Sequence, residues 1–346
     1  MKKLIKLKKN IKDHTKSYLI AEIAQAHDGS IGFAHSFIDL AKSVGADAVK
    51  FQCHIAKEET TFQDKFRKKF SFKNETRYEY WQRMEFSFDE WLGLKKHADK
   101  VGLDFICSVF SKKSLLMMRK LNLKIWKIAS GEIFDNKFIN EIAKENGFLI
   151  FSTGMIDYNS VSKFLEPITK INNNIAVLYC RSLYPTPLEE VFLNDMIKLE
   201  KKVNFPTGLS DHSGNPYVPI TAIGLGAKIL EMHLCFNKIQ FGPDTSSSLD
   251  PYEFRKVSEA NEVIFKILKS KNKFIKDKKI EKISTLFTKS LSINKDLPKG
   301  YKMTEKDIVL KKPSFGISPK NIKKIIGKKL NKNVYCKNLL KLSDFE

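Results

Sequence analysis

The chain has 346 residues, of which 42% are hydrophobic, and its formal net charge is +22. This length allows one large core and a small second domain, because a single core rarely exceeds roughly 250 to 300 residues. No apolar run reaches the ~18 to 20 residues of a membrane-spanning helix, and no Cys-x-x-Cys pair occurs among the five cysteines. We therefore expect a cytoplasmic protein without a disulfide framework or a membrane partner.

The positive charge does not by itself predict nucleic-acid binding. Only six of the 61 basic residues are arginine, and the lysines are spread through the whole chain. Proteins that recognise phosphates or bases usually cluster arginine side chains on one face. We interpret most of the charge as solvated lysine, with a remainder that favours an anionic substrate.

Short apolar runs alternate with segments of helical length through residues 1–268. The expected strands are residues 18–24, 46–52, 103–109, 123–129, 148–152 and 175–182 and two runs that begin at Phe205 and Lys228. Helical spacing marks residues 88–101 and residues 250–269 among others. Eight strands that alternate with helices predict an α/β protein with a (β/α)8 or TIM barrel.

Two segments depart from this alternation. Residues 55–86 are long, charged and aromatic, and they are either a loop over the mouth of a site or a surface insertion. Residues 269–284 are rich in lysine, and we interpret them as a linker. Residues 285–346 contain short apolar stretches separated by proline and glycine, which indicates a small second domain that needs to dock on another surface.

Two histidines end consecutive expected strands. His212 follows the run from Phe205, and His233 ends the run from Lys228. The segment between them has helical length, so the two strands are parallel and their carboxyl ends face the same side. Two imidazoles leave positions for water and substrate oxygens, which favours a divalent cation at this place.

Other polar side chains lie at the carboxyl ends of the strands, where catalytic residues gather in such barrels. They are Glu22, Lys50, Gln52, Ser108, Lys127, Ser130, Glu132, Ser152, Ser182, Tyr184 and Ser210. Two lysines and several hydroxyls on one rim are suited to a ligand that carries a phosphate and a carboxylate. A buried Glu22 requires a partner or a function, because an unpaired buried carboxylate is costly.

The sequence resembles the sialic acid (N-acetylneuraminate) synthases and their legionaminate and pseudaminate relatives. The matching stretches are Ala21-Glu22-Ile23, Gly45 to Gln52, Lys127 to Glu132, Ser152 to Met155, Tyr184 to Pro187, Gly208 to Ser213 and Gly242 to Asp244. The tail resembles the antifreeze-like (SAF) β-clip domain of these synthases at Lys289-Ser290-Leu291, Asp296 to Gly300 and Lys312 to Ile317. The resemblance covers the chain almost from end to end.

The resemblance implies a reaction in which phosphoenolpyruvate condenses with an N-acylated hexose aldehyde such as N-acetylmannosamine, giving a nonulosonic acid and phosphate. It assigns phosphoenolpyruvate binding to Lys50, Ser108, Lys127, Ser130, Ser152, Ser182 and Ser210. It assigns manganese, magnesium or cobalt to His212 and His233, proton or water handling to Glu22 and Glu132, and the acceptor to Gln52, Tyr184, Asp244 and Lys312. It also implies a domain-swapped homodimer in which the tail covers the partner's site.

The chain departs from the family pattern at some of the assigned positions. Lys312 replaces an arginine of the similar synthases, and lysine lacks the planar two-pronged contact of arginine. Ser182 replaces an asparagine of some members. The donor half of the site therefore follows the family more closely than the acceptor half does.

Two other functions stay open at this point. One is another phosphoenolpyruvate-using 3-deoxy sugar acid synthase or barrel aldolase, against which the antifreeze-like tail argues. The other is a basic carbohydrate-binding or nucleic-acid-binding protein without enzymatic activity. The presence of Lys50, Lys127, His212 and His233 argues against that second function.

Overall fold

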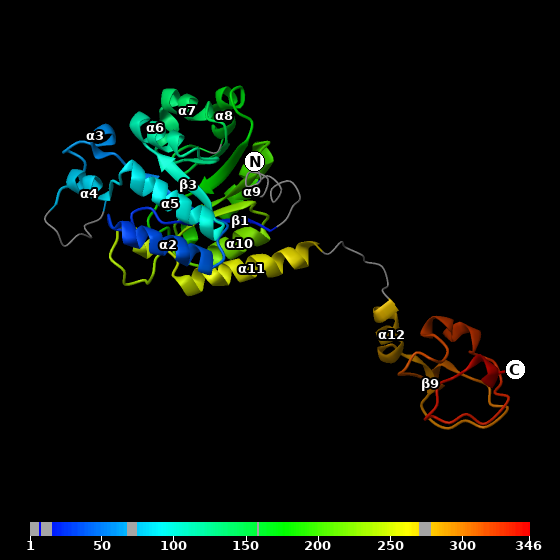
Figure 1. Cartoon of the computed structure of the whole chain (residues 1–346). Coiled ribbons are helices and arrows are strands. Elements are labelled where there is room, and N and C mark those ends of the chain that lie inside the picture. Colours follow the sequence, from blue (N-terminus) through cyan, green and yellow to red (C-terminus); the bar gives the residue numbers. More distant parts are fainter. Residues whose placement is uncertain (1–6, 8–15, 68–74, 158, 270–277) are drawn as a thin grey trace. The chain divides into compact units, whose positions relative to one another are not determined.

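The computed structural model (Figure 1) describes residue 7 and residues 16–67, 75–157, 159–269 and 278–346. By its internal contacts the chain divides into two units, Met1–Ser270 and Lys271–Glu346. Each unit has a hydrophobic core of its own.

Eight parallel strands of the first unit close into a barrel. Each strand pairs with the next along the chain, and β1 pairs with β8. The strands are β1 (Tyr18–Glu22), β2 (Ala48–Cys53), β3 (Asp104–Val109), β4 (Ile125–Ile128), β5 (Phe148–Ser152), β6 (Ile175–Cys180), β7 (Thr207–Asp211) and β8 (Ile229–His233). The predicted (β/α)8 barrel is confirmed, with strand ends that differ from the expected ones by a few residues.

Helices surround this barrel (Figure 1). They are α2 (Ile31–Ser43), α3 (Ala56–Glu59), α4 (Arg77–Met84), α5 (Phe88–Val101), α6 (Lys112–Lys120), α7 (Asn136–Ala143), α8 (Val161–Thr169), α9 (Leu193–Lys202), α10 (Tyr217–Gly224) and α11 (Pro251–Lys269). The bounds of α5 illustrate how local sequence sets them. Ser87 and Glu90 form a reciprocal capping box at its start, and Gly102 ends it in the left-handed conformation.

The core of the first unit has two parts, because successive strand residues point to opposite faces. The larger part lies between the strands and the helices and contains Phe51, Trp91 and Phe254. The smaller part fills the barrel interior and includes Tyr18 and Ile150. Among the described residues, no helix has both the length and the apolar composition needed to cross a membrane.

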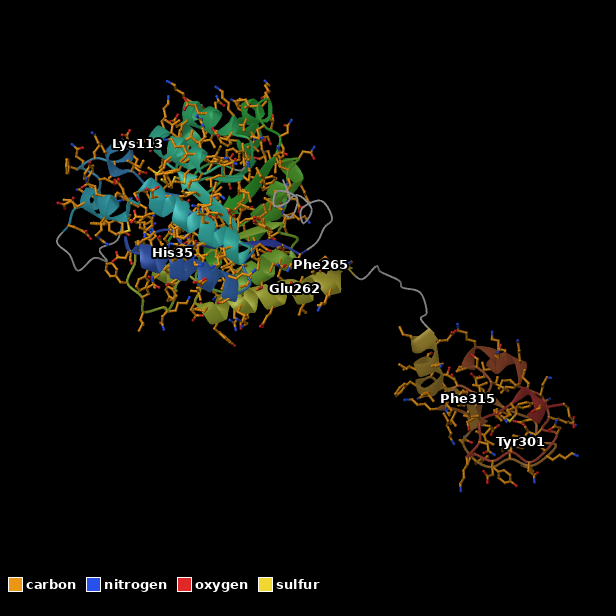
Figure 2. The ribbon with its side chains drawn as sticks, in the orientation of Figure 1. His35, Lys113, Glu262, Phe265, Tyr301 and Phe315 are labelled. Carbon is orange, nitrogen blue, oxygen red and sulfur yellow. The ribbon has the colours of Figure 1, made fainter. Side chains whose placement is uncertain are left out.

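The second unit contains α12 (Lys278–Phe287) and an antiparallel pair, β9 (Ser290–Ile293) and β10 (Ile308–Lys311). The hydroxyl of Tyr301, labelled in Figure 2, donates to the Asp307 carboxylate at 3.2 Å. The last part of the expected linker of residues 269–284 is helical from Lys278 onward. Ile280, Ile283 and Phe287 recur at helical spacing there, a pattern that the lysine content obscured. Residues 270–277 lie outside the described residues.

Candidate active site

The inward face of the barrel changes from apolar to polar along the strands. Residues two apart on a strand point the same way, so Ile229 is followed on its own face by Glu231 and then by His233. The lower positions form the buried cluster of Ile20, Ala48, Ile106, Ile125, Ile150, Leu178 and Ile229. The positions two residues later are Glu22, Lys50, Ser108, Lys127, Ser152, Cys180 and Glu231, and all of them are buried. The alternation thus brings one polar layer together at the carboxyl ends of the strands.

Two lysines and two carboxylates form the centre of this layer. Lys50 Nζ lies 2.6 Å from Glu22 Oε2 and 3.7 Å from Glu231 Oε1. Lys127 Nζ lies 3.5 Å from the same oxygen of Glu231. Gln52 Nε2 donates to the other oxygen of Glu22 at 2.6 Å. Both carboxylates are therefore compensated by cations, as buried charges must be.

Glu231 was not among the residues expected from the sequence. The expectation for this strand was limited to its last residue, His233. The signal was present, since Glu231 precedes His233 by two positions and must share its face. Burial disfavours the charged carboxylate, but Lys127 and Lys50 outweigh it and lower the pKa of Glu231 to about 2.

Burial and the opposite charges also shift the other groups of the layer: for Lys50, burial lowers the pKa, but Glu22 and Glu231 outweigh it and the pKa is raised. Burial raises the pKa of Glu22, although Lys50 counteracts it. Burial also lowers the pKa of Lys127, with Glu231 opposing that shift. The layer therefore holds ionisable groups in a dry environment, which is typical of sites that bind or transform charged ligands.

The hydroxyls of the layer differ in their hydrogen bonds. Lys127 Nζ donates to Ser152 Oγ at 2.8 Å, and Ser210 Oγ donates to Glu231 Oε1 at 3.1 Å. Ser108 Oγ and Glu231 Oε2 are buried and have no hydrogen-bond partner among the described residues. Buried polar atoms are normally paired, so these two atoms mark a place where a ligand or water supplies the missing bonds.

His212 and His233 converge at one side of the layer, with ring centres 5.4 Å apart. Tyr184 lies against both rings, at 4.0 Å from His212 and 6.1 Å from His233. Burial lowers the pKa of His233 to about 4, so this imidazole is neutral at pH 7. For His212, burial lowers the pKa, but the Cys180 thiol outweighs it and the pKa rises to about 9.

The donor set suits a cation with open positions. His212 Nδ1 lies 2.9 Å from the Arg181 carbonyl oxygen, which can only accept, so Nδ1 carries a hydrogen and Nε2 is the nitrogen that a cation would use. A cation at Nε2 competes with a proton for that lone pair. Across the described part of the chain, no three His, Cys, Asp or Glu side chains group as a metal site. Two imidazoles alone would leave the other positions of a cation to water or substrate oxygens.

A cavity of about 300 Å³ opens above the polar layer. Gln52, Tyr184, His233 and Asp244 line it from the strand ends. The insertion of residues 55–86 lines the opposite side with Phe66, Arg67, Arg77, Tyr80 and Trp81. The insertion therefore covers the mouth of the site, the first of the two arrangements expected for it.

Arg67 ties this insertion to the strand-end loops. Its guanidinium donates to Asp244 Oδ1 at 2.9 Å, and its carbon Cζ lies 4.1 Å from the centre of the Tyr184 ring. No local pattern predicts this contact, because Arg67 and Asp244 are separated by 177 positions.

Four more of the expected site residues make contacts of their own within their units. Ser130 Oγ accepts from the Gly154 amide at 3.2 Å, and Ser182 Oγ lies 4.0 Å from Cys180 Sγ. Glu132 lies in a short 3-10 helix, Glu132–Phe134, where burial and then Glu59 raise its pKa to about 7. Lys312 lies in the second unit, with its ammonium 5.1 Å from the Phe287 ring centre.

Comparisons with known proteins agree on one family. The model of the NeuB family matches residues 37–273. The N,N'-diacetyllegionaminic acid synthase of Legionella pneumophila is 30% identical over 325 residues, covering 92% of this chain and 91% of that protein. A pseudaminic acid synthase of Campylobacter jejuni is 31% identical and covers 97% of this chain and 99% of that one.

A solved structure shows the same architecture. The N-acetylneuraminic acid synthetase of Leptospira borgpetersenii superposes with a TM-score of 0.68 and 27% identity, covering 78% of this chain and 90% of that chain.

Proposed function

The chain belongs to the NeuB family, and from this premise we propose that it condenses phosphoenolpyruvate with an N-acylated amino-sugar aldehyde. The enol carbon of phosphoenolpyruvate forms the new bond to the aldehyde carbon. One water is consumed, phosphate leaves, and the product is a nonulosonic acid. The family relatives are synthases of sialic, legionaminic and pseudaminic acids.

The observation that carries this proposal is the buried layer of Lys50 and Lys127 beside unpaired Ser108 Oγ. Phosphoenolpyruvate is a small anion with a phosphate and a carboxylate, and it needs cations and hydroxyl donors within reach of both groups. Lys50 and Lys127 supply the charge, and the hydroxyls supply hydrogen bonds. We assign the donor subsite to Lys50, Ser108, Lys127, Ser130, Ser152, Ser182 and Ser210.

The acceptor aldehyde binds in the cavity above this layer. Gln52, Tyr184 and Asp244 line that cavity together with His233, which supports assigning them to the acceptor, to which we also assign Lys312. Glu22 lies beneath Gln52 and beside Lys50, where a carboxylate can take or give a proton as water adds to the donor carbon. We assign Glu132 an auxiliary role in handling protons or water.

A divalent cation, manganese or alternatively magnesium or cobalt, belongs to the same proposal. His212 and His233 would hold it through ring nitrogens. When bound, such a cation polarises the aldehyde oxygen and stabilises the negative charge that develops there. The protein contributes the neutral His233 imidazole and the fixed Nδ1 hydrogen of His212.

The second unit completes the proposal. We assign residues 285–346 to an antifreeze-like domain that docks on the partner's barrel in a cytoplasmic homodimer and presents Lys312 to the acceptor. Light scattering that finds an active monomer would reject this arrangement.

The test is phosphate release with purified protein. It should require phosphoenolpyruvate, a divalent ion and an N-acylmannosamine-like sugar together, and the mass of the product should equal donor plus acceptor plus water less phosphoric acid. Release with phosphoenolpyruvate and a phosphorylated pentose, but not with the amino sugars, would indicate a 3-deoxy sugar acid synthase. No release across a broad panel of amino sugars would reject the proposed function.

A further inference from the structure

A buried histidine lies directly after β2 and has no place in the substrate contacts assigned above. His54 is 8% exposed. Its ring stacks on Phe110 at 4.3 Å with planes 12° apart, and Trp81 of α4 covers its other side at 4.0 Å. Two aromatic side chains therefore fix the plane of this imidazole.

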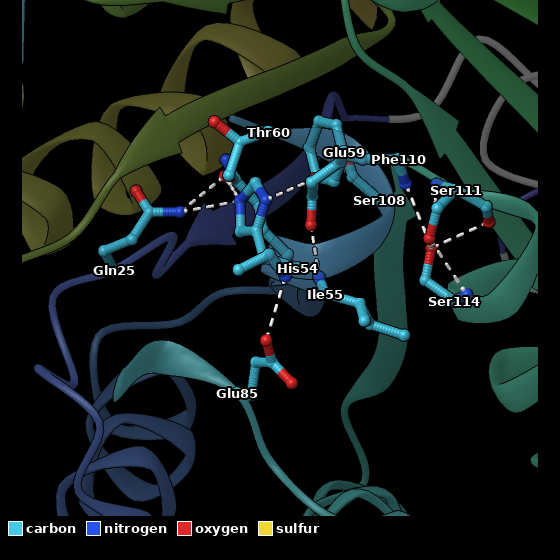
Figure 3. Close-up of polar contacts among 12 residues, drawn as sticks. Gln25, His54, Ile55, Glu59, Thr60, Glu85, Ser108, Phe110, Ser111 and Ser114 are labelled. Carbon is cyan, nitrogen blue, oxygen red and sulfur yellow. Dashed lines mark hydrogen bonds and ion pairs between the residues drawn. The ribbon is translucent and has the colours of Figure 1, made fainter. Parts of the chain in front are cut away.

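The hydrogen bonds of His54 select one tautomer (Figure 3). Nδ1 lies 2.9 Å from Glu59 Oε2, and the other oxygen of Glu59 accepts from the Ile55 amide. An ionised carboxylate only accepts hydrogen bonds. Nδ1 therefore carries the hydrogen, and Nε2 presents a lone pair.

That lone pair accepts from Gln25. Gln25 Nε2 lies 3.0 Å from His54 Nε2 and 2.7 Å from Gln52 Oε1. An amide nitrogen has two hydrogens, so it donates to both acceptors. The 3.0 Å approach of His54 Nε2 to Gln52 Oε1 follows from their sharing this donor.

The chain of bonds ends at Glu22. Because Gln25 donates to Gln52 Oε1, the amide nitrogen of Gln52 must face the other way, where it donates to Glu22 Oε1 at 2.6 Å. A flipped Gln52 would present its oxygen to a carboxylate oxygen, which is repulsive. The Gln25 amide that His54 Nε2 holds and the Glu22 carboxylate therefore favour the same orientation of Gln52.

We propose that His54, held by Glu59, is a positioning residue that orients the Glu22 carboxylate through Gln25 and Gln52. The inference rests on the proposed function only in that Glu22 is taken to serve the condensation. It adds Gln25, His54 and Glu59 to the machinery of the site.

Two substitutions of His54 separate its two hydrogen bonds. His54→Gln keeps an amide oxygen near Nε2 as an acceptor for Gln25, whereas His54→Asn keeps a donor near Nδ1 for Glu59 and loses that acceptor. We expect His54→Asn to lower kcat about 10- to 100-fold, as happens when a group that orients a functional ligand is removed. His54→Gln should keep most of kcat, and the KM for phosphoenolpyruvate should change little in either variant. Equal losses of kcat in both variants, in step with equal losses of Tm, would overturn the proposal.

His97→Asn is the matched control. His97 is also a partly buried histidine paired with a carboxylate, at 2.9 Å from Asp39, and it contacts His35 on α2 (Figure 2). It lies on the outer helices, so kcat should not change.

A measurement without turnover tests the tautomer directly. In ¹⁵N-labelled protein, the side-chain nitrogen resonances of His54 should report a hydrogen on Nδ1 and a bare Nε2. A hydrogen on Nε2 would overturn the proposal whether or not any sugar is condensed. Correct resonances in a protein that condenses no acceptor would reject the proposed function and leave the hydrogen-bond chain standing.

Discussion

Arg67 donates a hydrogen bond of 2.9 Å to Asp244 and so joins the insertion after β2 to the loop after β8 across the mouth of the cavity. The same guanidinium stacks on Tyr184. Both partners are assigned to the acceptor, so Arg67 fixes two acceptor contacts at once.

Replacement of Arg67 by alanine should weaken acceptor binding specifically. Losing one charge-assisted contact between partly exposed groups should raise the acceptor KM roughly tenfold, with the KM for phosphoenolpyruvate nearly unchanged. Steady-state kinetics with each substrate varied in turn measures this. Arg119→Ala, which removes an ion pair with Glu145 on the outer helices, should change neither constant. A rise confined to the KM for phosphoenolpyruvate would contradict this prediction, because it would assign Arg67 to the donor subsite instead of the acceptor subsite.

Ser108→Ala should separate ligand binding from stability. Ser108 Oγ has no hydrogen-bond partner in the part of the chain that the structure describes, so its removal should leave Tm unchanged or slightly raised. If it contacts phosphoenolpyruvate, a hydrogen bond to a charged group is lost and the KM should rise about 10- to 100-fold. Ser114→Ala, which breaks the cap of α6, should show the opposite pattern. Unchanged phosphoenolpyruvate binding, measured by calorimetry, would remove Ser108 from the donor subsite.

The depressed pKa of Glu231 predicts a particular dependence of stability on pH. Lys127 and Lys50 lower its pKa from 4.5 to about 2 despite burial. Its contribution to stability is therefore full above the unfolded pKa of 4.5 and is lost as pH falls through about 2.

Glu231→Gln should consequently reduce the loss of folding stability that occurs as pH falls from above 4.5 toward about 2. Urea unfolding at pH 5 and pH 3 should show a smaller decrease for the variant than for the unchanged protein. Glu166→Gln, at an exposed pair with Lys170, should retain the full decrease. An identical decrease in Glu231→Gln would mean that Glu231 is not held ionised by the lysines.

Chelation should abolish the condensation, and added manganese should restore it. His212→Ala and His233→Ala should each lose this restoration at micromolar metal, because each removes one of two imidazole donors. Phosphoenolpyruvate binding, measured by calorimetry, should persist in both variants. Full activity of the chelated protein would contradict the assignment of the two histidines.

The strand ends of the site were predictable because strand alternation is local. An apolar run that ends in Lys50, Lys127, His212 or His233 indicates which end of the strand carries the polar side chains and which residues share a face. The contacts across the mouth were not predictable, because Arg67 meets Asp244 through a loop whose path no local pattern determines. The role of His54 was not predictable for a related reason, since its hydrogen bonds are made to Gln25 and Glu59, which belong to different segments.

The division of the barrel interior has a further meaning for how such a protein can change over time. Residues such as Ile20, Ile106 and Ile150 belong to the apolar part of the interior. In the strand ladder they are the direct partners of Glu231, Lys50 and Lys127 of the polar layer. A change of side-chain size in the apolar part therefore also shifts the backbone that positions the charges, so the two parts have to adapt together.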